Sequence, residues 1–136
     1  AWGTMLGCHC FALEENDRHA EAEPHGRAAV ALNPADLWST HAVAHVLEMQ
    51  GRHEEGIDFL TGLAPNWAAG NNLVHHLWWH RGMMHLGQGN HGAMLELYDT
   101  RFRNLASPLT QATRSAGVAG WRDLAWRAGR PAPACR

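Results

Sequence analysis

The chain has 136 residues, a formal net charge of −2 at pH 7, 11 His residues and no Lys. This length suits one domain that can bury a core without disulfides or a structural metal. The near-neutral charge and the scattered Arg residues exclude the basic patch that nucleic acids or anionic membranes require, so neither is expected as a partner.

The sequence repeats itself at a regular interval. The stretch "LEENDRHAEA" (13–22) matches "LEMQGRHEEG" (47–56) in Leu, Glu, Arg, His and Glu, and "HLGQGNHGAM" (85–94) follows more loosely after a slightly longer interval. A period of about 34 residues is typical of tetratricopeptide arrays of paired helices. The sequence therefore predicts an all-α, tetratricopeptide-like α/α superhelix of about three helix-turn-helix repeats plus a C-terminal helix, in one domain over residues 1–129.

The first predicted repeat covers residues 3–36. Its first helix ends near Asn16, and its second runs from His19 to Leu32, because Pro34 stops a helix and restricts the residue before it. Asp36 can then cap the first helix of the next repeat.

The later predicted elements follow the same pattern. Repeat two covers residues 37–70 and is followed by an insertion, and repeat three covers residues 75–107. The expected helices are, in order, Trp38–Gln50, one from near Glu54 to before Pro65, Asn72–Leu86, Ala93–Phe102 and Trp121–Ala128.

Three histidines occupy one equivalent place, at the start of each second helix: His19, His53 and His91. Tetratricopeptide repeats usually have Tyr at this place, where it packs between the two helices. We therefore interpret these three residues as packing residues and not as ligands.

Two other pairs of histidines fall at places that face the concave groove of such arrays. His41 and His45 lie in the first helix of repeat two, and His76 and His80 lie in the first helix of repeat three. Each pair is spaced i, i+4, which puts both side chains on one helical face. Glu14 and Glu48 also fall at groove-facing places, so the groove is expected to be lined with imidazole and carboxylate.

Two such pairs on neighbouring helices predict a metal site between them. Helical proteins hold metals in this way, and four imidazoles, or three with a water, suit Zn(II), with Fe, Cu or Ni as alternatives. His9 is expected nearby as a fifth ligand or as a donor to a ligand. The alternative is structural, because neutral His can lie in a helix interface with a backbone or water partner.

Cysteine usage favours a reducing, cytoplasmic setting. Cys8, Cys10 and Cys135 are an odd number, and two of them are one residue apart, which argues against a disulfide framework. Cys8 and Cys10 could ligate a soft metal, although small buried thiols are commoner. We expect residues 130–136 to be a disordered tail and the chain to be part of a longer protein.

The combination of "MLGCHCFALEEN", "WSTHAVAHVLEMQGRHEEGIDFL" and "LVHHLWWHRGMMHLGQGNHGAMLELYD" resembles bacterial members of the tetratricopeptide repeat protein 38 family over residues 3–101. The resemblance implies an α/α superhelix and supplies no activity. Family positions map onto His9, His41, His45, His76 and His80. Family members are several times longer, so exposed repeat ends predict a homodimer.

The leading functional hypothesis is a promiscuous, metal-dependent hydrolase of small esters or phosphoesters, including phosphotriesters. The histidines would hold Zn(II) with an open position for water, and Glu48 would act as the catalytic residue by orienting that water or taking its proton. Trp78, Trp79 and Met83 would supply an apolar wall for the substrate.

Three alternatives remain open. The chain could be a non-catalytic scaffold for a peptide or protein partner, although His stands where a carboxylate clamp would need Lys or Arg. It could bind metal without turnover, which four protein ligands would favour. Oxidative chemistry at iron has weaker support, because the paired Glu-x-x-His motifs of di-iron bundles are missing.

Overall fold

The computed structural model describes residues 2–102. The predicted C-terminal helix at Trp121–Ala128, the tail and the end of the third repeat lie outside the described residues. The described part is entirely helical, which confirms the all-α expectation. Its elements are α1 (Trp2–Glu14), α2 (His19–Leu32), α3 (Leu37–Met49), α4 (His53–Leu63), the 3₁₀ turn η1 (Ala64–Trp67), α5 (Leu73–Gly87), α6 (His91–Leu97) and the π-helical turn η2 (Tyr98–Phe102).

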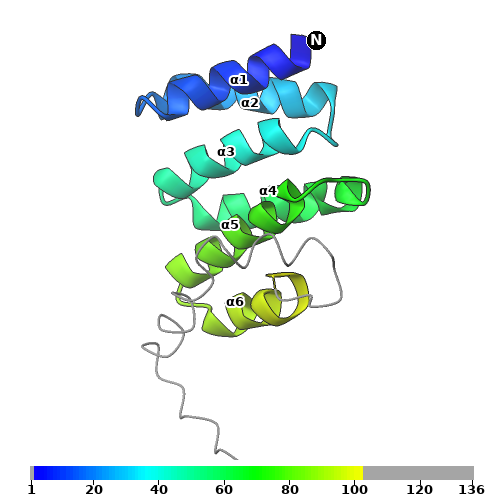
Figure 1. Ribbon diagram of the computed structural model, residues 1–136. Coiled ribbons are helices and arrows are strands. Elements are labelled where there is room, and N and C mark those ends of the chain that lie inside the picture. Colours follow the sequence, from blue (N-terminus) through cyan, green and yellow to red (C-terminus); the bar gives the residue numbers. More distant parts are fainter. Residues whose placement is uncertain (1, 103–136) are drawn as a thin grey trace, which may run out of the picture.

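The helices form three successive hairpins, α1/α2, α3/α4 and α5/α6, which are stacked along the chain (Figure 1). The first helices of the hairpins are neighbours, since α3 contacts both α1 and α5. Side chains from α3 and α5 can therefore meet although α4 and η1 separate the two helices in the sequence.

The three hairpins share one turn geometry. Asp17, Gly51 and Gly89 have φ angles of 58°, 69° and 74°, in the left-handed region. In each turn, the backbone N–H of the residue after the positive-φ residue donates to a carbonyl in the last turn of the preceding helix, as in a Schellman motif. These bonds are Arg18 to Leu13 (3.0 Å), Arg52 to Leu47 (2.8 Å) and Asn90 to His85 (2.8 Å). Each turn lies at the same place in its copy of the sequence repeat, so the repeat in the sequence is a repeat of the hairpin.

The helix boundaries follow the local sequence. Helix α2 has the predicted limits, and α3 begins at Leu37 because the Asp36 carboxylate accepts from the backbone N–H groups of Trp38 and Ser39. The last helix, α6, is shorter than predicted and continues as the η2 turn. The 3₁₀ turn η1, which contains Pro65, lies at the end of the second predicted repeat, just before the insertion.

The main core lies between α3, α4 and α5, where Val43, Leu47, Leu60, Leu77 and Met84 are fully buried. The core residues of α3 occupy faces other than the one that carries its two groove histidines. None of the helices in residues 2–102 is long and apolar enough to cross a lipid bilayer.

Candidate metal centre

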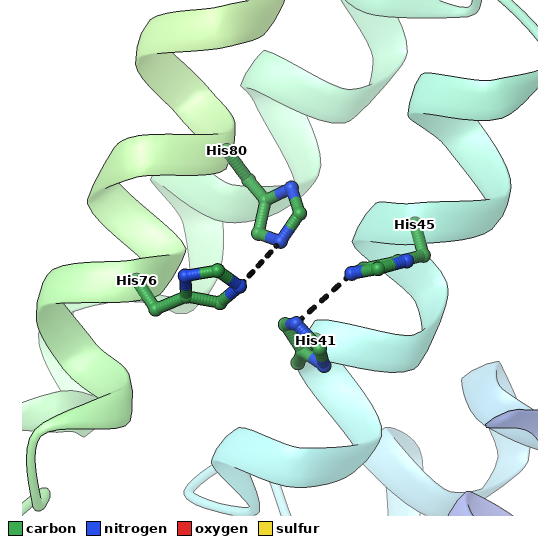
Figure 2. Close-up of side chains that lie close together, drawn as sticks. All are labelled: His41, His45, His76 and His80. Atoms are coloured by element: carbon green, nitrogen blue, oxygen red, sulfur yellow. Dashed lines mark hydrogen bonds between the residues drawn. The ribbon is translucent and has the colours of Figure 1, made fainter. Parts of the chain in front are cut away.

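Four histidines from two neighbouring helices form one cluster. His41 and His45 project from α3, His76 and His80 project from α5, and all four rings point into the space between the two helices (Figure 2). One ring nitrogen from each residue lies within 4.8 Å of the others. The fold therefore brings together the two pairs that the sequence predicted separately.

The distances within each pair suit coordination to one ion. The Nε2 atoms of His41 and His45 are 3.0 Å apart, and those of His76 and His80 are 3.1 Å apart. Two nitrogens bound to a tetrahedral zinc would be about 3.3–3.4 Å apart, given bond lengths of about 2.0–2.1 Å. A small movement of either pair would therefore convert the hydrogen bond between rings into shared coordination.

Burial keeps the inner histidines neutral. His41 is 6% exposed and His80 is 3% exposed. Burial, reinforced by the neighbouring imidazoles, lowers the pKa of His41 to about 3 and that of His80 to about 2. The same causes lower the pKa of His76. Neutral imidazole is the form that binds a metal, so these ligands need not release a proton at neutral pH before they bind one.

Carboxylates lie behind two of the rings, on the side away from the cluster centre. The Nδ1–H of His80 donates to the Glu48 carboxylate at 2.6 Å, and His45 Nδ1 lies 3.5 Å from the Glu14 carboxylate. Glu14 and Glu48 directly follow Leu13 and Leu47, which match in the sequence repeat, so the two carboxylates occupy equivalent repeat places. A carboxylate in this position fixes the tautomer and leaves the Nε2 lone pair free for a metal.

Both carboxylates are unusual in their surroundings. Glu14 is 6% exposed, and its Oε2 has no hydrogen-bond partner among the described residues. Burial raises the pKa of Glu48, and the nearby His45, His53 and His76 oppose that shift. Glu14 and the exposed Glu15 also form a smaller potential metal-binding group with His45.

Aromatic side chains surround the more exposed part of the cluster. His76 is exposed, and the Trp79 ring stacks on it with a centroid distance of 5.2 Å and an interplanar angle of 6°. On the α3 side the Trp38 ring lies 5.5 Å from the His41 ring, and Phe11 of α1 lies 4.9 Å from Trp38. Within the described residues, no Arg forms a hydrogen bond or ion pair with the four histidines.

The remaining predicted site residues lie elsewhere. His9, the expected fifth ligand, is exposed and its ring packs against His25 of α2 at 4.6 Å, so it is not part of the cluster. Trp78 is buried in the core and packs against Trp67, because it lies about 100° around the helix from Trp79. Met83 is half-buried on α5.

The two cysteines of α1 are also separate from the cluster. Cys8 is exposed, whereas Cys10 is fully buried and burial raises the pKa of its thiol to about 11. A buried thiol of raised pKa is an inert packing residue and not a ready thiolate ligand.

The histidines at the hairpin turns lie where the sequence predicted. His19, His53 and His91 are the first residues of α2, α4 and α6. His19 and His53 are half-buried, and the His53 ring occupies the space beside Gly87 of α5. His91 is exposed, so it does not pack between helices as expected.

Sequence reasoning missed Phe11 and Trp38 beside the cluster. Both occupy places that the tetratricopeptide prediction assigns to the groove, the ninth of repeat one and the second of repeat two. The rule that selected the histidines would have selected them too, had it been applied to aromatic residues. No protein-family model and no solved structure matches this chain.

Proposed function

We propose that this protein is a metal-binding helical-repeat protein of the tetratricopeptide type and that it acts as a promiscuous metal-dependent hydrolase on small esters or phosphoesters, including phosphotriesters. The observation that carries the proposal is the convergence of four imidazole nitrogens within 4.8 Å of one another, with carboxylates behind two of the rings. The three equivalent turns, each at the same place in its repeat, support the tetratricopeptide assignment and the family resemblance.

The residues present fit a divalent transition metal, and Zn(II) fits best. All the candidate ligands are imidazoles, which zinc accepts in tetrahedral sites, and no hard oxygen cage of the kind that Ca²⁺ or Mg²⁺ needs surrounds the cluster in the described residues. A zinc ion bound here would supply a Lewis acid and a water of lowered pKa.

The protein's own residues would orient the ligands and leave one side of the site open. Glu48 holds the His80 ring through Nδ1 and Glu14 lies behind the His45 ring, so their first task is to aim the Nε2 atoms. The exposed His76 lies on the open side, where a substrate could approach. Release of His76 from a metal would leave three protein ligands and an open position, the arrangement of catalytic zinc sites.

The surroundings favour neutral substrates with an aromatic group. Trp79 lies on one side of the cluster, and Trp38 and Phe11 lie on the other. The charged groups nearest to the rings are the carboxylates of Glu14 and Glu48, which would repel a phosphomonoester dianion. Aryl carboxylate esters and aryl phosphotriesters carry no such charge and would stack on the indole rings.

The test begins with metal content. Elemental mass spectrometry of the purified chain should give about one zinc per chain, which His41→Ala should remove. His91→Ala is the matched control, because His91 is exposed and starts a different helix. The metal-loaded protein is then assayed with 4-nitrophenyl acetate, diethyl 4-nitrophenyl phosphate and 4-nitrophenyl phosphate. Zinc-dependent turnover of the two neutral esters, lost in His41→Ala, would support the proposal.

A second candidate is a metal site without turnover, favoured by the presence of four imidazoles, which are enough to close a tetrahedron. Azide added to the cobalt(II)-substituted protein separates the two candidates, because an anion replaces a bound water and changes the visible bands of cobalt, whereas four histidine ligands leave no position for it. Cobalt bound by four histidines, together with no hydrolysis of any ester, would establish the structural role. A protein that never takes up metal would instead leave a peptide-binding scaffold.

A further inference from the structure

A pocket of about 290 Å³ lies between α5 and the two short turns η1 and η2. Its walls combine aromatic and aliphatic side chains with polar ones, and they include the ring of Trp78. The other lining residues are Ala64, Trp67, Ala68, Gly70, Asn71, Val74, His75 and Arg101. The volume is near the lower end of small-molecule sites, which suits a ligand with a single ring.

Two guanidinium groups without a carboxylate partner lie beside the Trp78 ring of this pocket. Arg101 lies 4.7 Å from the centroid of the Trp78 ring, and Arg81 lies 5.4 Å from it. Neither has an acidic oxygen within 4.0 Å among the described residues, and the Nε atom of Arg81 is buried without a partner there. Every other Arg in the described chain is ion-paired: Arg18, Arg27 and Arg52.

The pocket wall also contains a buried donor without an acceptor. Trp67 is 3% exposed, and its indole N–H has no hydrogen-bond partner in the described residues. This N–H is closed to solvent, so a ligand in the pocket would contact the Trp67 ring and not its N–H. His75 lines the same pocket, but its Nδ1–H donates to the Arg101 carbonyl at 3.1 Å.

We propose that this pocket binds a small aromatic carboxylate. The ring would lie against Trp78 and Val74, and the carboxylate would face the guanidinium of Arg101. The excess positive charge selects an anion, and the apolar walls select an aromatic body.

This site is separate from the histidine cluster. His76 and His80 face α3, whereas His75 and Trp78 face the pocket, since residues one or two places apart on a helix point in different directions. The inference therefore does not depend on the proposed hydrolase, and it is tested without metal.

The experiment is isothermal titration calorimetry on the full chain after treatment with a chelator. Sodium benzoate is the probe, and sodium acetate and benzyl alcohol are matched controls that lack the ring and the charge, respectively. Benzoate should bind once per chain, at least tenfold more tightly than either control. Equal affinity for acetate and benzoate, or no binding of benzoate, would overturn the proposal.

Variants locate the bound benzoate. Arg101→Gln should weaken binding about tenfold, because it removes the ionic contact and keeps most of the packing. Arg18→Gln is the control, since Arg18 is exposed just before α2 and pairs with Glu21. Because Arg101 is also exposed, its variant should fold. Equal effects of Arg101→Gln and Arg18→Gln, or binding that requires zinc and is lost in His41→Ala, would refute the site.

Discussion

Proton affinity distinguishes His41 and His80 of the cluster from ordinary imidazoles. His41 and His80 are almost fully removed from water, and each lies beside other imidazoles, so a proton on either ring is unfavourable. The metal-free protein holds these rings neutral across the physiological range of pH. These neutral rings can bind a cation directly. They also make the free energy of unfolding depend on pH.

We predict that the metal-free protein loses stability as the pH falls from about 6.5 toward 3. In this window the unfolded chain protonates His41 and His80 at their ordinary pKa of 6.5, whereas the folded pKa values are about 3 and about 2. The unfolded state thus binds more protons, and each histidine contributes a slope of up to roughly 1.4 kcal/mol per pH unit. Above pH 7 both states are neutral and the contribution is constant.

Urea unfolding at pH 8, 7, 6 and 5 measures this slope. His80→Gln should reduce it, whereas His91→Ala, at an exposed position, should leave it unchanged. Glu48 contributes a pH dependence of opposite sign, because burial raises its pKa. The slope is therefore also measured in Glu48→Gln, where this contribution is absent. A slope that is the same in wild type and in His80→Gln would show that the buried imidazoles do not control the transition.

Replacement of the carboxylates separates ligand orientation from catalysis. Glu48→Gln should weaken zinc affinity about 10-fold to 100-fold, because His80 loses its charged acceptor. Glu14→Gln should weaken it less, since the Glu14 contact with His45 is longer. Competition with a chromogenic chelator measures the zinc affinity of both variants. The kcat at saturating zinc then measures any separate effect on turnover. A kcat that collapses in Glu48→Gln alone, at full metal occupancy, would show that this carboxylate contributes to turnover beyond holding the metal.

The helical hairpin is the unit that places these side chains. Each hairpin closes through one residue with positive φ, and two of these three residues are Gly, which adopts that conformation without steric strain. Because the turn is the same in each hairpin, the first helices of the hairpins have the same rotation about their axes relative to the turn. The faces of α3 and α5 that carry the histidine pairs thereby point toward each other (Figure 2).

We predict opposite effects for two Gly→Ala substitutions that both point into open space. Gly51 has a φ of 69°, so Gly51→Ala should destabilise the protein by about 1 kcal/mol through backbone strain alone. Gly62 lies inside α4 with ordinary helical geometry, so Gly62→Ala should be neutral or stabilising by up to about 0.5–1 kcal/mol. Chemical denaturation measures the free energy of unfolding of both variants. Changes of equal sign in the two variants would argue against the turn geometry.

The histidines at the hairpin turns should affect stability and not metal. His53→Ala removes a ring that packs beside Gly87, and His19→Ala removes a half-buried ring at the equivalent place, so each should cost roughly 1 kcal/mol. Thermal unfolding and elemental analysis of the same samples test both halves of this prediction. Loss of stoichiometric zinc from either variant would mean that the assigned repeat phase is wrong.

At the scale of the whole molecule, a metal in the cluster would join the second hairpin to the third. Its ligands come in pairs from α3 and α5, so unfolding of either hairpin would destroy the site. Such a link matters in a stack of repeats, because each hairpin is stabilised only by its neighbours.

We predict that zinc raises the unfolding temperature of the wild-type chain and that a chelator lowers it again. The expected gain is about 2.7 kcal/mol when free zinc is about 100 times its dissociation constant. His41→Ala should show no such gain, and Mg²⁺ should have no effect on the wild type, because imidazole ligands disfavour it. Differential scanning calorimetry gives the comparison, and an equal shift in His41→Ala would place the zinc elsewhere.

The sequence by itself determined the features that depend on local geometry. The offset between the matching segments predicted the hairpins and their turns, and the i, i+4 spacing of His41 with His45, and of His76 with His80, put each pair on one face. These predictions needed only the period of the helix, which a short stretch of chain already fixes.

Only the tertiary structure decided which faces meet. The distance between the two histidine pairs, the Glu48 contact with His80 and the Trp79 stack on His76 depend on how α3 and α5 pack. The packing of α1 against α2 turned His9 toward His25, and the packing of α5 against η1 put Trp78 in the core, next to the pocket. Rotation of one helix by about 100°, the angle of a single residue, exchanges one face for another, and a repeat pattern alone does not fix that rotation.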